Sequence, residues 1–242
     1  GGVDRMRRDP SMSDAEKAAR LDGHYGYTEG LLFPMWSTLT TDTQSPYIID
    51  RLPKDRPYAW ILTADPNKRH GALLSAIDHE GNRYYCAEHY ADGLPDSEHA
   101  EAYRGMLHQF GLKTDDVQVF ADPGGAGKQA IINFAEVGFF ASPVPKDPGS
   151  VSASIKRLRR AAHLDRHRVH PVTGQSGSPQ VFFLRSLESY WKDGGTEYRE
   201  SRLLWELRQY RQKADCAPDT PVKKNDDLAD CARYVELVHP DG

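Results

Sequence analysis

The chain has 242 residues and a formal net charge of -4 at pH 7, with 31 lysines and arginines against 35 aspartates and glutamates. This balance argues against a protein that coats nucleic acid through bulk positive charge. Hydrophobic residues make up 38% of the chain, and no run approaches the roughly 18 apolar residues of a membrane span. The 3 cysteines lack metal-ligand spacing, so we expect reduced thiols that serve packing. The length favours one main domain.

The N-terminal part carries weak structural signals. Ser13 to Leu21 predicts a helix, because a serine start precedes helix formers. Ser45 to Pro57 contains three prolines and mixed charges, which is typical of a linker. We expect no secretory signal, because the opening residues GGVDRMRRDPSMSD have no apolar segment.

A three-stranded meander is predicted next. Its strands are YAWILTAD (Tyr58 to Asp65), GALLSAI (Gly71 to Ile77) and RYYCAEHY (Arg83 to Tyr90), joined by short turns. A helix should follow, capped by Asp96 or Ser97 and ending at Gly111.

Strands and helices then alternate. We expect a strand at Val117 to Ala121, a helix at Lys128 to Val137, a strand in FFASPVP, a basic helix after Ser150, a hairpin of RVHPV with QVFFL, and helices at Arg202 to Tyr210 and Asp226 to Val238. This pattern predicts a mixed α/β domain.

The segment VQVFADPGGAGKQ, from Val117 to Gln129, suggests either a phosphate cradle or a metal carboxylate. A nucleotide-binding P-loop needs glycine, four residues, then Gly-Lys followed by Ser or Thr, because backbone amides hold phosphates and the hydroxyl ligates magnesium. Here Asp122 stands at the first glycine position and Gln129 replaces the hydroxyl residue. A carboxylate in the cradle would repel phosphates. We therefore reject nucleotide binding.

Two aspartates follow predicted strands. Asp65 ends the first strand and Asp122 the fourth, and a proline follows each. Open α/β sheets place their sites at the carboxyl ends of strands. If the two strands are neighbours, both carboxylates reach one point, where their like charges need a cation between them. Hard oxygen ligands indicate magnesium or manganese.

The last predicted helix offers further carboxylates. In NDDLADCARY, Asp227 and Asp230 are three residues apart, and Asp226 and Asp230 are four apart, so they can share a helix face. Asp226 precedes the apolar period and is the natural N-cap. Asp230 lies in the helix body, where capping explains little, so it is the stronger candidate ligand.

One stretch of the acidic chain is densely basic. It is SIKRLRRAAHLDRHRVH, from Ser154 to His170. A solvated helix face and a nucleic-acid contact surface both explain such a run. The sequence leaves both interpretations open.

Several segments together resemble the C-terminal nuclease domain of tailed-bacteriophage terminase large subunits. ADPNKRHGALLSAIDHEGNRYYCAEHY is similar to the family's first-Asp hairpin, and VQVFADPGGAGKQAIINFAEVGF to its second-Asp segment. SPVPKDPGSVSASIKRLR is similar to its lysine-then-serine turn and helix. The most specific match is the closing signature, LLWELRQYRQK followed by PVKKNDDLADCARYV.

The resemblance implies an α/β, RNase H-like fold of the retroviral integrase superfamily. We expect a mixed sheet of about five or more strands, flanked by helices and carrying an extra β-hairpin. Residues 1–57 would be an N-terminal extension or linker from an ATPase domain, whose Walker motifs do not occur in this sequence. Residues 58–242 would be the nuclease domain.

The resemblance also implies two divalent ions, Mg²⁺ or Mn²⁺. Asp65 and Asp122 would share one ion, and Asp230 with Asp227 would complete a second site. Many family members have histidine at the position of Asp227, which leaves open whether Asp227 or Asp230 holds the second ion. Glu88 either approaches the ions or pairs across strands, and we favour pairing.

The implied reaction is endonucleolytic cleavage of concatemeric double-stranded viral DNA during packaging. Expected DNA contacts are Lys146, Lys156, Arg157, Arg159 and Arg160. The implied partners are the ATPase domain of the same chain, the terminase small subunit and the portal, with no membrane, in the cytoplasm of the infected bacterial host. Two alternatives stay open: another RNase H-like nuclease such as a junction resolvase, and a non-catalytic domain that docks on DNA or the portal.

Overall fold

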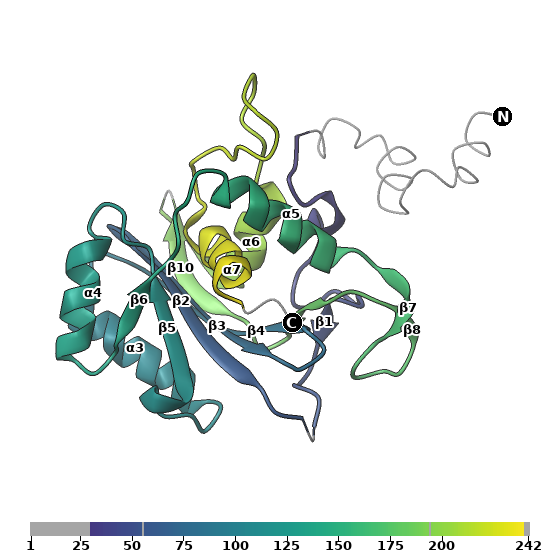
Figure 1. Ribbon diagram of the computed structural model, residues 1–242, viewed down its shortest axis with the longest axis horizontal. Helices are drawn as coiled ribbons and strands as arrows, with labels where there is room; N and C mark the ends of the chain where they lie inside the picture. Colours follow the sequence, from purple (N-terminus) through teal and green to yellow (C-terminus); the bar gives the residue numbers. More distant parts are fainter. Residues whose placement is uncertain (1–29, 55, 194, 240–242) are drawn as a thin grey trace.

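A mixed sheet of seven strands lies at the centre of the computed structural model, which describes residues 30–54, 56–193 and 195–239 (Figure 1). The strand order is β1-β9-β4-β3-β2-β5-β6. The strands are β1 (Ile48–Ile49), β2 (Ala59–Pro66), β3 (Arg69–Ile77), β4 (Arg83–Asp92), β5 (Val117–Ala121), β6 (Ala141–Pro143) and β9 (Val181–Leu184). The predicted antiparallel meander is β2, β3 and β4, and parallel pairs extend the sheet on both sides of it.

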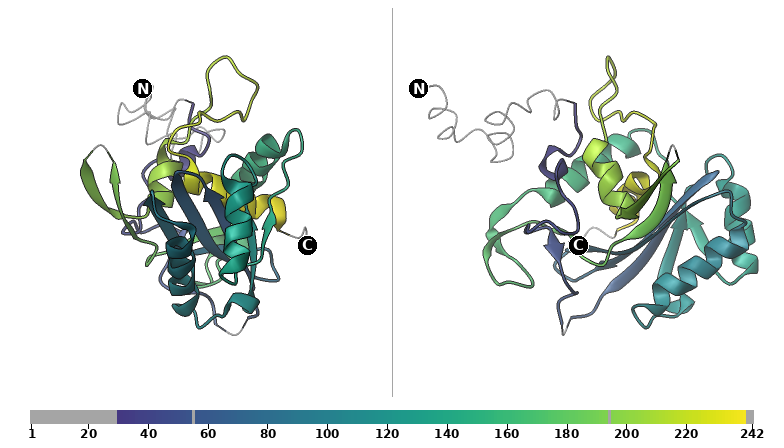
Figure 2. Two further views of the ribbon diagram at one scale, coloured as in Figure 1. Left: turned by 90° about the vertical axis from the view of Figure 1, so that its left-hand side faces the viewer. Right: turned by 180° about the vertical axis from the view of Figure 1, so that it is seen from behind.

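Helices cover both faces of the sheet (Figures 1 and 2). One layer is α3 (Asp96–His108) and α4 (Gly127–Glu136), and the other is α5 (Ser150–Ala162), α6 (Arg202–Gln209) and α7 (Asp227–Val238). Two short segments, η1 (Pro34–Trp36) and η2 (Thr114–Asp116), are 3-10 helices. The predicted mixed α/β architecture, a sheet of more than five strands flanked by helices, is confirmed.

Alternation along β2 assigns its side chains to the two layers. Leu62 and Ala64 pack in the core under α3 and α4, whereas Ile61 packs in the core under α5, α6 and α7. Thr63 follows the same alternation as Ile61, and its hydroxyl donates to the carbonyl oxygen of Cys231 on α7 over 3.0 Å. Because side chains repeat every second residue in a strand, Asp65 also lies on the α7 face.

The predicted pairing of RVHPV with QVFFL is wrong. A hairpin does form there, but β7 (Asp165–Val169) pairs with β8 (Ser176–Ser178). β9 instead joins the main sheet, parallel to both β4 and β1. Its four residues are all buried, so the strand needs cover on both faces, which a two-stranded hairpin does not provide. A second hairpin, β10 (Ser189–Asp193) with β11 (Thr196–Glu200), was not predicted.

The linker-like N-terminal segment packs on the sheet where the structure describes it. Phe33, Trp36 and Ile48 lie in the core, and the Trp36 ring contacts Phe183 edge-on at 5.2 Å. Residues 1–29, including the helix predicted at Ser13 to Leu21, lie outside the described residues. The assignment of residues 1–57 to an ATPase connection stays a prediction.

The cysteines differ in their environment. Cys86 and Cys231 are buried free thiols, as expected for packing residues, whereas Cys216 is exposed. Of the helices in the described residues, none has the length and apolar character needed to cross a membrane.

Candidate active site

Neighbouring strands bring Asp65 and Asp122 to the same edge of the sheet. β2 and β5 are parallel and in register, with Ala64 opposite Ala121. The amide of Asp122 donates to the carbonyl oxygen of Ala64 over 2.9 Å, and both aspartates are buried. The condition on which the shared site depends, that these two strands are neighbours, is met.

The glycine-rich turn after β5 serves Asp122 rather than a phosphate. The Gly124 amide donates to Asp122 Oδ1 over 2.6 Å, and the Gly127 amide donates to the Gly124 carbonyl over 2.8 Å. A Cβ on Gly127 would lie 1.7 Å from the Asp122 carbonyl oxygen. Only glycine allows this approach, so the Gly127–Lys128 pair that mimics a P-loop is a requirement of the turn.

Helix α7 brings Asp227 and Asp230 over the same strands. A Cβ on Gly71 of β3 would lie 3.1 Å from the carbonyl carbon of Asp227, so the helix start rests on the strand backbone. Both aspartates are buried. The four predicted carboxylates are therefore near enough for the charges of Asp230, Asp122 and Asp227 to act on Asp65.

The charged form of Asp65 is disfavoured in the folded chain. Burial, followed by the charges of Asp230, Asp122 and Asp227, raises the pKa of Asp65 from an ordinary 3.8 to about 8. Within the described part of the chain, the Oδ2 atom of Asp227 is buried without a hydrogen-bond partner, and Arg69 Nε lies 4.0 Å from it. Carboxylate oxygens whose charges repel one another form a donor set that suits a hard divalent cation.

Asp122 has a cationic neighbour. Lys146 Nζ forms an ion pair with Asp122 Oδ2, and the Tyr234 hydroxyl donates to the same oxygen over 2.6 Å. Burial raises the pKa of Asp122, but the bonds from Lys146, Tyr234 and the Gly124 amide outweigh it and hold the pKa below its ordinary value. Asp122 is therefore a stable anion.

Asp230 is held in the same way. Lys223 Nζ lies 2.6 Å from Asp230 Oδ2, Arg233 Nη2 lies 2.7 Å from Oδ1, and the Tyr210 hydroxyl donates to Oδ1 over 2.9 Å. Burial raises the pKa of Asp230, but Arg233 and Lys223 outweigh this effect and lower it. Lys223, which sequence reasoning missed, also lies 3.1 Å from Asp226 Oδ2.

Side-chain ammonium groups occupy part of this donor set. Among residues 30–54, 56–193 and 195–239, no three His, Cys, Asp or Glu side chains are arranged as a group that could hold a metal ion. Lys146 and Lys223 take oxygen atoms of Asp122 and Asp230. A divalent cation would compete with these lysines for the carboxylates.

The start of α7 is capped from α6, not by Asp226 as predicted. The Asp226 side chain makes no capping bond. Glu206 Oε2 instead accepts from the amides of Leu228 and Ala229 over 2.7 and 2.9 Å. Glu206 and Tyr210 are the Glu and Tyr of the Glu-Leu-X-X-Tyr part of the closing signature. Glu206 caps the start of α7, and the Tyr210 hydroxyl donates a hydrogen bond to Asp230.

A buried cation links Glu206 to the β10–β11 hairpin. Arg202 Nε donates to Glu206 Oε1 over 2.8 Å. Its guanidinium lies 4.4 Å from the ring centroid of Tyr90, 4.3 Å from Trp191 on the hairpin, and 4.2 Å from Trp205. These contacts tie the hairpin to the helix that carries Asp227 and Asp230.

Glu88 caps α6 rather than pairing across strands. Its carboxylate accepts from the amides of Arg202 and Leu203 over 2.5 and 3.1 Å. The hydroxyls of Ser189 and Ser201 donate to it over 2.6 and 2.9 Å. A sequence signal existed, since Ser201 stands at a helix start, but the partner from β4 is distant in the chain.

The capping role of Glu206 is testable by substitution. Glu206→Gln keeps the shape but turns an amide NH₂ donor toward either the Arg202 guanidinium or the first amides of α7, which lose their acceptor. We therefore expect a loss of about 3 kcal/mol in the free energy of unfolding, the cost of leaving buried donors without an acceptor. Urea unfolding followed by circular dichroism measures it. Glu101→Gln is the control, because Glu101 forms an exposed ion pair with Arg104, worth about 0.5 kcal/mol. Equal losses for both variants would contradict the capping role.

The basic residues predicted to contact DNA have unequal roles. Lys146 lies beside Asp122, and Lys156, Arg157, Arg159 and Arg160 lie on α5. Arg159 pairs with Asp219 over 2.8 Å, and Arg157 donates to the carbonyl oxygen of Glu236 over 2.8 Å. These two arginines therefore also support the fold, whereas Lys156 and Arg160 are exposed.

The sheet order, the two helical layers and the acidic edge together define a domain of the RNase H-like class. The sequence matches no protein-family model and no curated protein. Among solved structures, the P22 large terminase nuclease domain aligns with a TM-score of 0.58 and 16% identity over 87% of this chain and 93% of that one. The large terminase of a thermophilic bacteriophage aligns with a TM-score of 0.57 and 17% identity.

The likeness identifies the fold as that of large terminase nuclease domains, as the sequence resemblance predicted. The alignment with the thermophilic phage terminase covers 82% of this chain but 44% of that protein. A second crystal form of the same terminase gives a TM-score of 0.55 with 93% and 51% coverage. The chain thus spans about half the length of this whole terminase.

Proposed function

We propose that the chain is a divalent-metal-dependent DNA endonuclease, the nuclease part of a terminase large subunit that cuts concatemeric double-stranded viral DNA during packaging. One observation carries the proposal: the parallel pairing of β2 and β5 places Asp65 and Asp122 at neighbouring strand ends. The charges of Asp230, Asp122 and Asp227 add to burial in raising the pKa of Asp65. The fold shared with terminase nuclease domains supports it.

Asp65, Asp122, Asp227 and Asp230 would hold two ions, Mg²⁺ or Mn²⁺. The bound ions would activate the attacking water and stabilise the leaving oxygen of the phosphodiester. The Asp227 oxygen that has no hydrogen-bond partner among the described residues favours a ligand role for Asp227 as well as for Asp230. Carboxylate oxygens suit hard cations, which would have to displace the ammonium groups of Lys146 and Lys223 from Asp122 and Asp230.

The chain's own residues would position the carboxylates and the substrate. Tyr234 and Gly124 orient Asp122, and Tyr210 and Arg233 orient Asp230. The Lys146 side chain is 46% exposed, so its ammonium group can turn from Asp122 to a DNA phosphate. We expect low sequence specificity, because phosphate contacts position DNA without reading bases.

The wider assignment follows from the terminase role. The ATPase domain of the same polypeptide, the terminase small subunit and the portal would be the partners, and the cytoplasm of the infected bacterial host would be the site of action. The ATPase domain would supply grip on the DNA, so cleavage by this chain alone should be weak.

Cleavage of supercoiled plasmid tests the proposal. The chain is incubated with plasmid in Mn²⁺, Mg²⁺ or EDTA, beside an Asp122→Asn variant, and nicking and linearisation are followed on gels. We expect metal-dependent cutting that the variant reduces by at least about 100-fold, the size of a lost catalytic electrostatic contact.

The control is Asp115→Asn, because Asp115 is exposed in η2, and it should cut as the unchanged chain does. Equal cutting by the Asp122→Asn variant would contradict the site. Cutting of branched but not linear DNA would favour a junction resolvase. No cutting by the folded chain at any Mn²⁺ concentration would favour a docking domain.

A further inference from the structure

A basic groove lies between α5 and the β7–β8 hairpin. Its volume is about 850 Å³. The residues that line it, called the hairpin groove below, are Lys156, Arg159, Arg160, His163, Leu164, Asp165, Arg166, His167, Arg168 and Gln180. Five of these are lysine or arginine and one is a carboxylate, in a chain with a net charge of -4. The positive charge is therefore concentrated here.

Part of this charge is available to a ligand. Arg159 pairs with Asp219, and Arg168 donates to Asn82 Oδ1 over 2.9 Å, so both are fixed in the fold. Arg160 and Arg166 are exposed, and so is Lys156. Lys156 Nζ also lies 4.0 Å from Asp219 Oδ2, so Arg160 and Arg166 are the exposed groove cations that can bind an anion without disturbing this ion pair.

The hairpin groove is separate from the acidic site. α5 begins at Ser150, just after the loop that carries Lys146, and leads away to the β7–β8 hairpin (Figures 1 and 2). Arg160 follows Ser150 by ten residues, which is about 15 Å along a helix. This length corresponds to roughly four base pairs of duplex, so one DNA molecule can reach both places.

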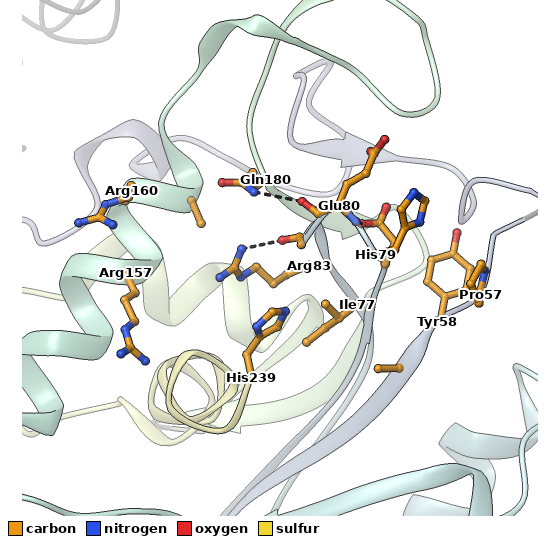
Figure 3. A pocket seen from close by; sticks show the side chains of 14 residues that line it. Pro57, Tyr58, Ile77, His79, Glu80, Arg83, Arg157, Arg160, Gln180 and His239 are labelled. Carbon is orange, nitrogen blue, oxygen red and sulfur yellow. Dashed lines mark hydrogen bonds between the residues drawn. The ribbon is translucent and has the colours of Figure 1, made fainter. Parts of the chain in front are cut away.

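A second pocket extends the hairpin groove. It shares Arg160 and Gln180 with the groove and is also lined by Arg157, Arg83 and His239. Figure 3 shows Arg157 and Arg160 on one helix, with Arg83 and His239 across the pocket from them. The same pocket is lined by Asp78 and Glu80, and Arg83 pairs with Glu236 over 2.9 Å, so Arg157 is the basic residue of α5 that this pocket adds.

We propose that the hairpin groove binds the sugar–phosphate backbone of duplex DNA at a second place on the chain, whose lining includes none of the four aspartates of the acidic site. The lining contains no Phe, Tyr or Trp on which unpaired bases would stack, which argues against a single-strand site. Arginine forks match phosphate geometry. The choice of DNA as the anion rests on the proposed function.

Equilibrium binding in EDTA tests the groove without cleavage. Fluorescence anisotropy of a labelled 30-base-pair duplex is measured over a salt series with the unchanged chain, an Arg160→Glu/Arg166→Glu variant and a Lys54→Glu control. Lys54 is exposed and is not part of the groove lining. The double variant should bind at least about 10-fold more weakly, and the slope of log K against log salt should shrink by about 2, as for two lost phosphate contacts.

Each result of this experiment either supports or overturns the groove proposal. Unchanged affinity and slope in the double variant, with an unchanged circular dichroism spectrum, would overturn the proposal. A single-stranded 30-mer that binds as tightly as the duplex and loses affinity equally would overturn the duplex assignment. Plasmid cutting is measured separately. If the groove variant loses DNA binding but the unchanged chain does not cut plasmid, the proposed nuclease function is wrong and the groove proposal stands. If the chain cuts plasmid and the groove variant binds DNA normally, the groove proposal is wrong and the nuclease function stands.

Discussion

Replacing Asp65 by asparagine is expected to stabilise the metal-free protein at pH 8 while abolishing metal-dependent cleavage. Burial and the charges of Asp230, Asp122 and Asp227 raise the pKa of Asp65 to about 8, so its ionisation opposes folding. A raised folded-state pKa gives stability that is complete below the unfolded value of 3.8 and is lost as the pH rises through 8. Asparagine removes this loss.

The gain should be about 2 kcal/mol at pH 8 and near zero at pH 4, because each pKa unit corresponds to about 1.4 kcal/mol and relaxation reduces the full shift. Thermal unfolding in EDTA at the two pH values measures it. Asp230→Asn is the matched control and should destabilise the protein at pH 8, because Arg233, Lys223 and Tyr210 lose their partner. A gain of equal size at pH 4 would contradict the electrostatic explanation.

The second large effect is expected from Gly127→Ala. The added Cβ would lie 1.7 Å from the Asp122 carbonyl oxygen, so the turn after β5 cannot keep its path. We expect a loss of about 4 kcal/mol in the free energy of unfolding, in the range of severe steric substitutions, together with loss of cleavage because Asp122 moves. Urea unfolding and the plasmid assay measure the two effects.

Gly105→Ala separates this effect from the general consequence of replacing a glycine. Gly105 is exposed within α3 and a Cβ there meets no atom within 4 Å. Alanine should stabilise that helix by about 0.5 to 1 kcal/mol. If both variants gained stability, the close approach of Gly127 to Asp122 would be wrong.

Local sequence patterns were sufficient for most of the fold. The strand predicted at Val117 to Ala121 matches β5, and the helix predicted at Arg202 to Tyr210 matches α6 to within one residue. One error concerns pairing partners, and the β10–β11 hairpin was not predicted at all. Val181 to Leu184 is a run of apolar residues that reads equally well as a hairpin strand or a buried strand, and burial against both layers decides for the second.

The sequence predicts the site residues that lie at strand ends. It does not predict the residues that reach the site through contacts between elements far apart in the chain. Asp65 and Asp122 follow from the rule that sites lie at carboxyl ends of strands. Lys223 lies in a loop without a period, and its link to Asp230 exists only in the folded chain. The sequence assigns the cap of α7 to Asp226 instead of Glu206 for the same reason, because α6, which carries Glu206, meets α7 only in the folded chain.

The contacts of Arg202 with tryptophan rings mean that intrinsic fluorescence can report on the position of α7. Two of its four tryptophans, Trp191 and Trp205, flank the guanidinium that is bonded to Glu206, which in turn holds the first amides of α7. Indole emission depends on the charge and distance of such a neighbour. A shift of α7 is therefore transmitted to intrinsic fluorescence without any attached dye, and single substitutions to phenylalanine would assign the signal to one ring.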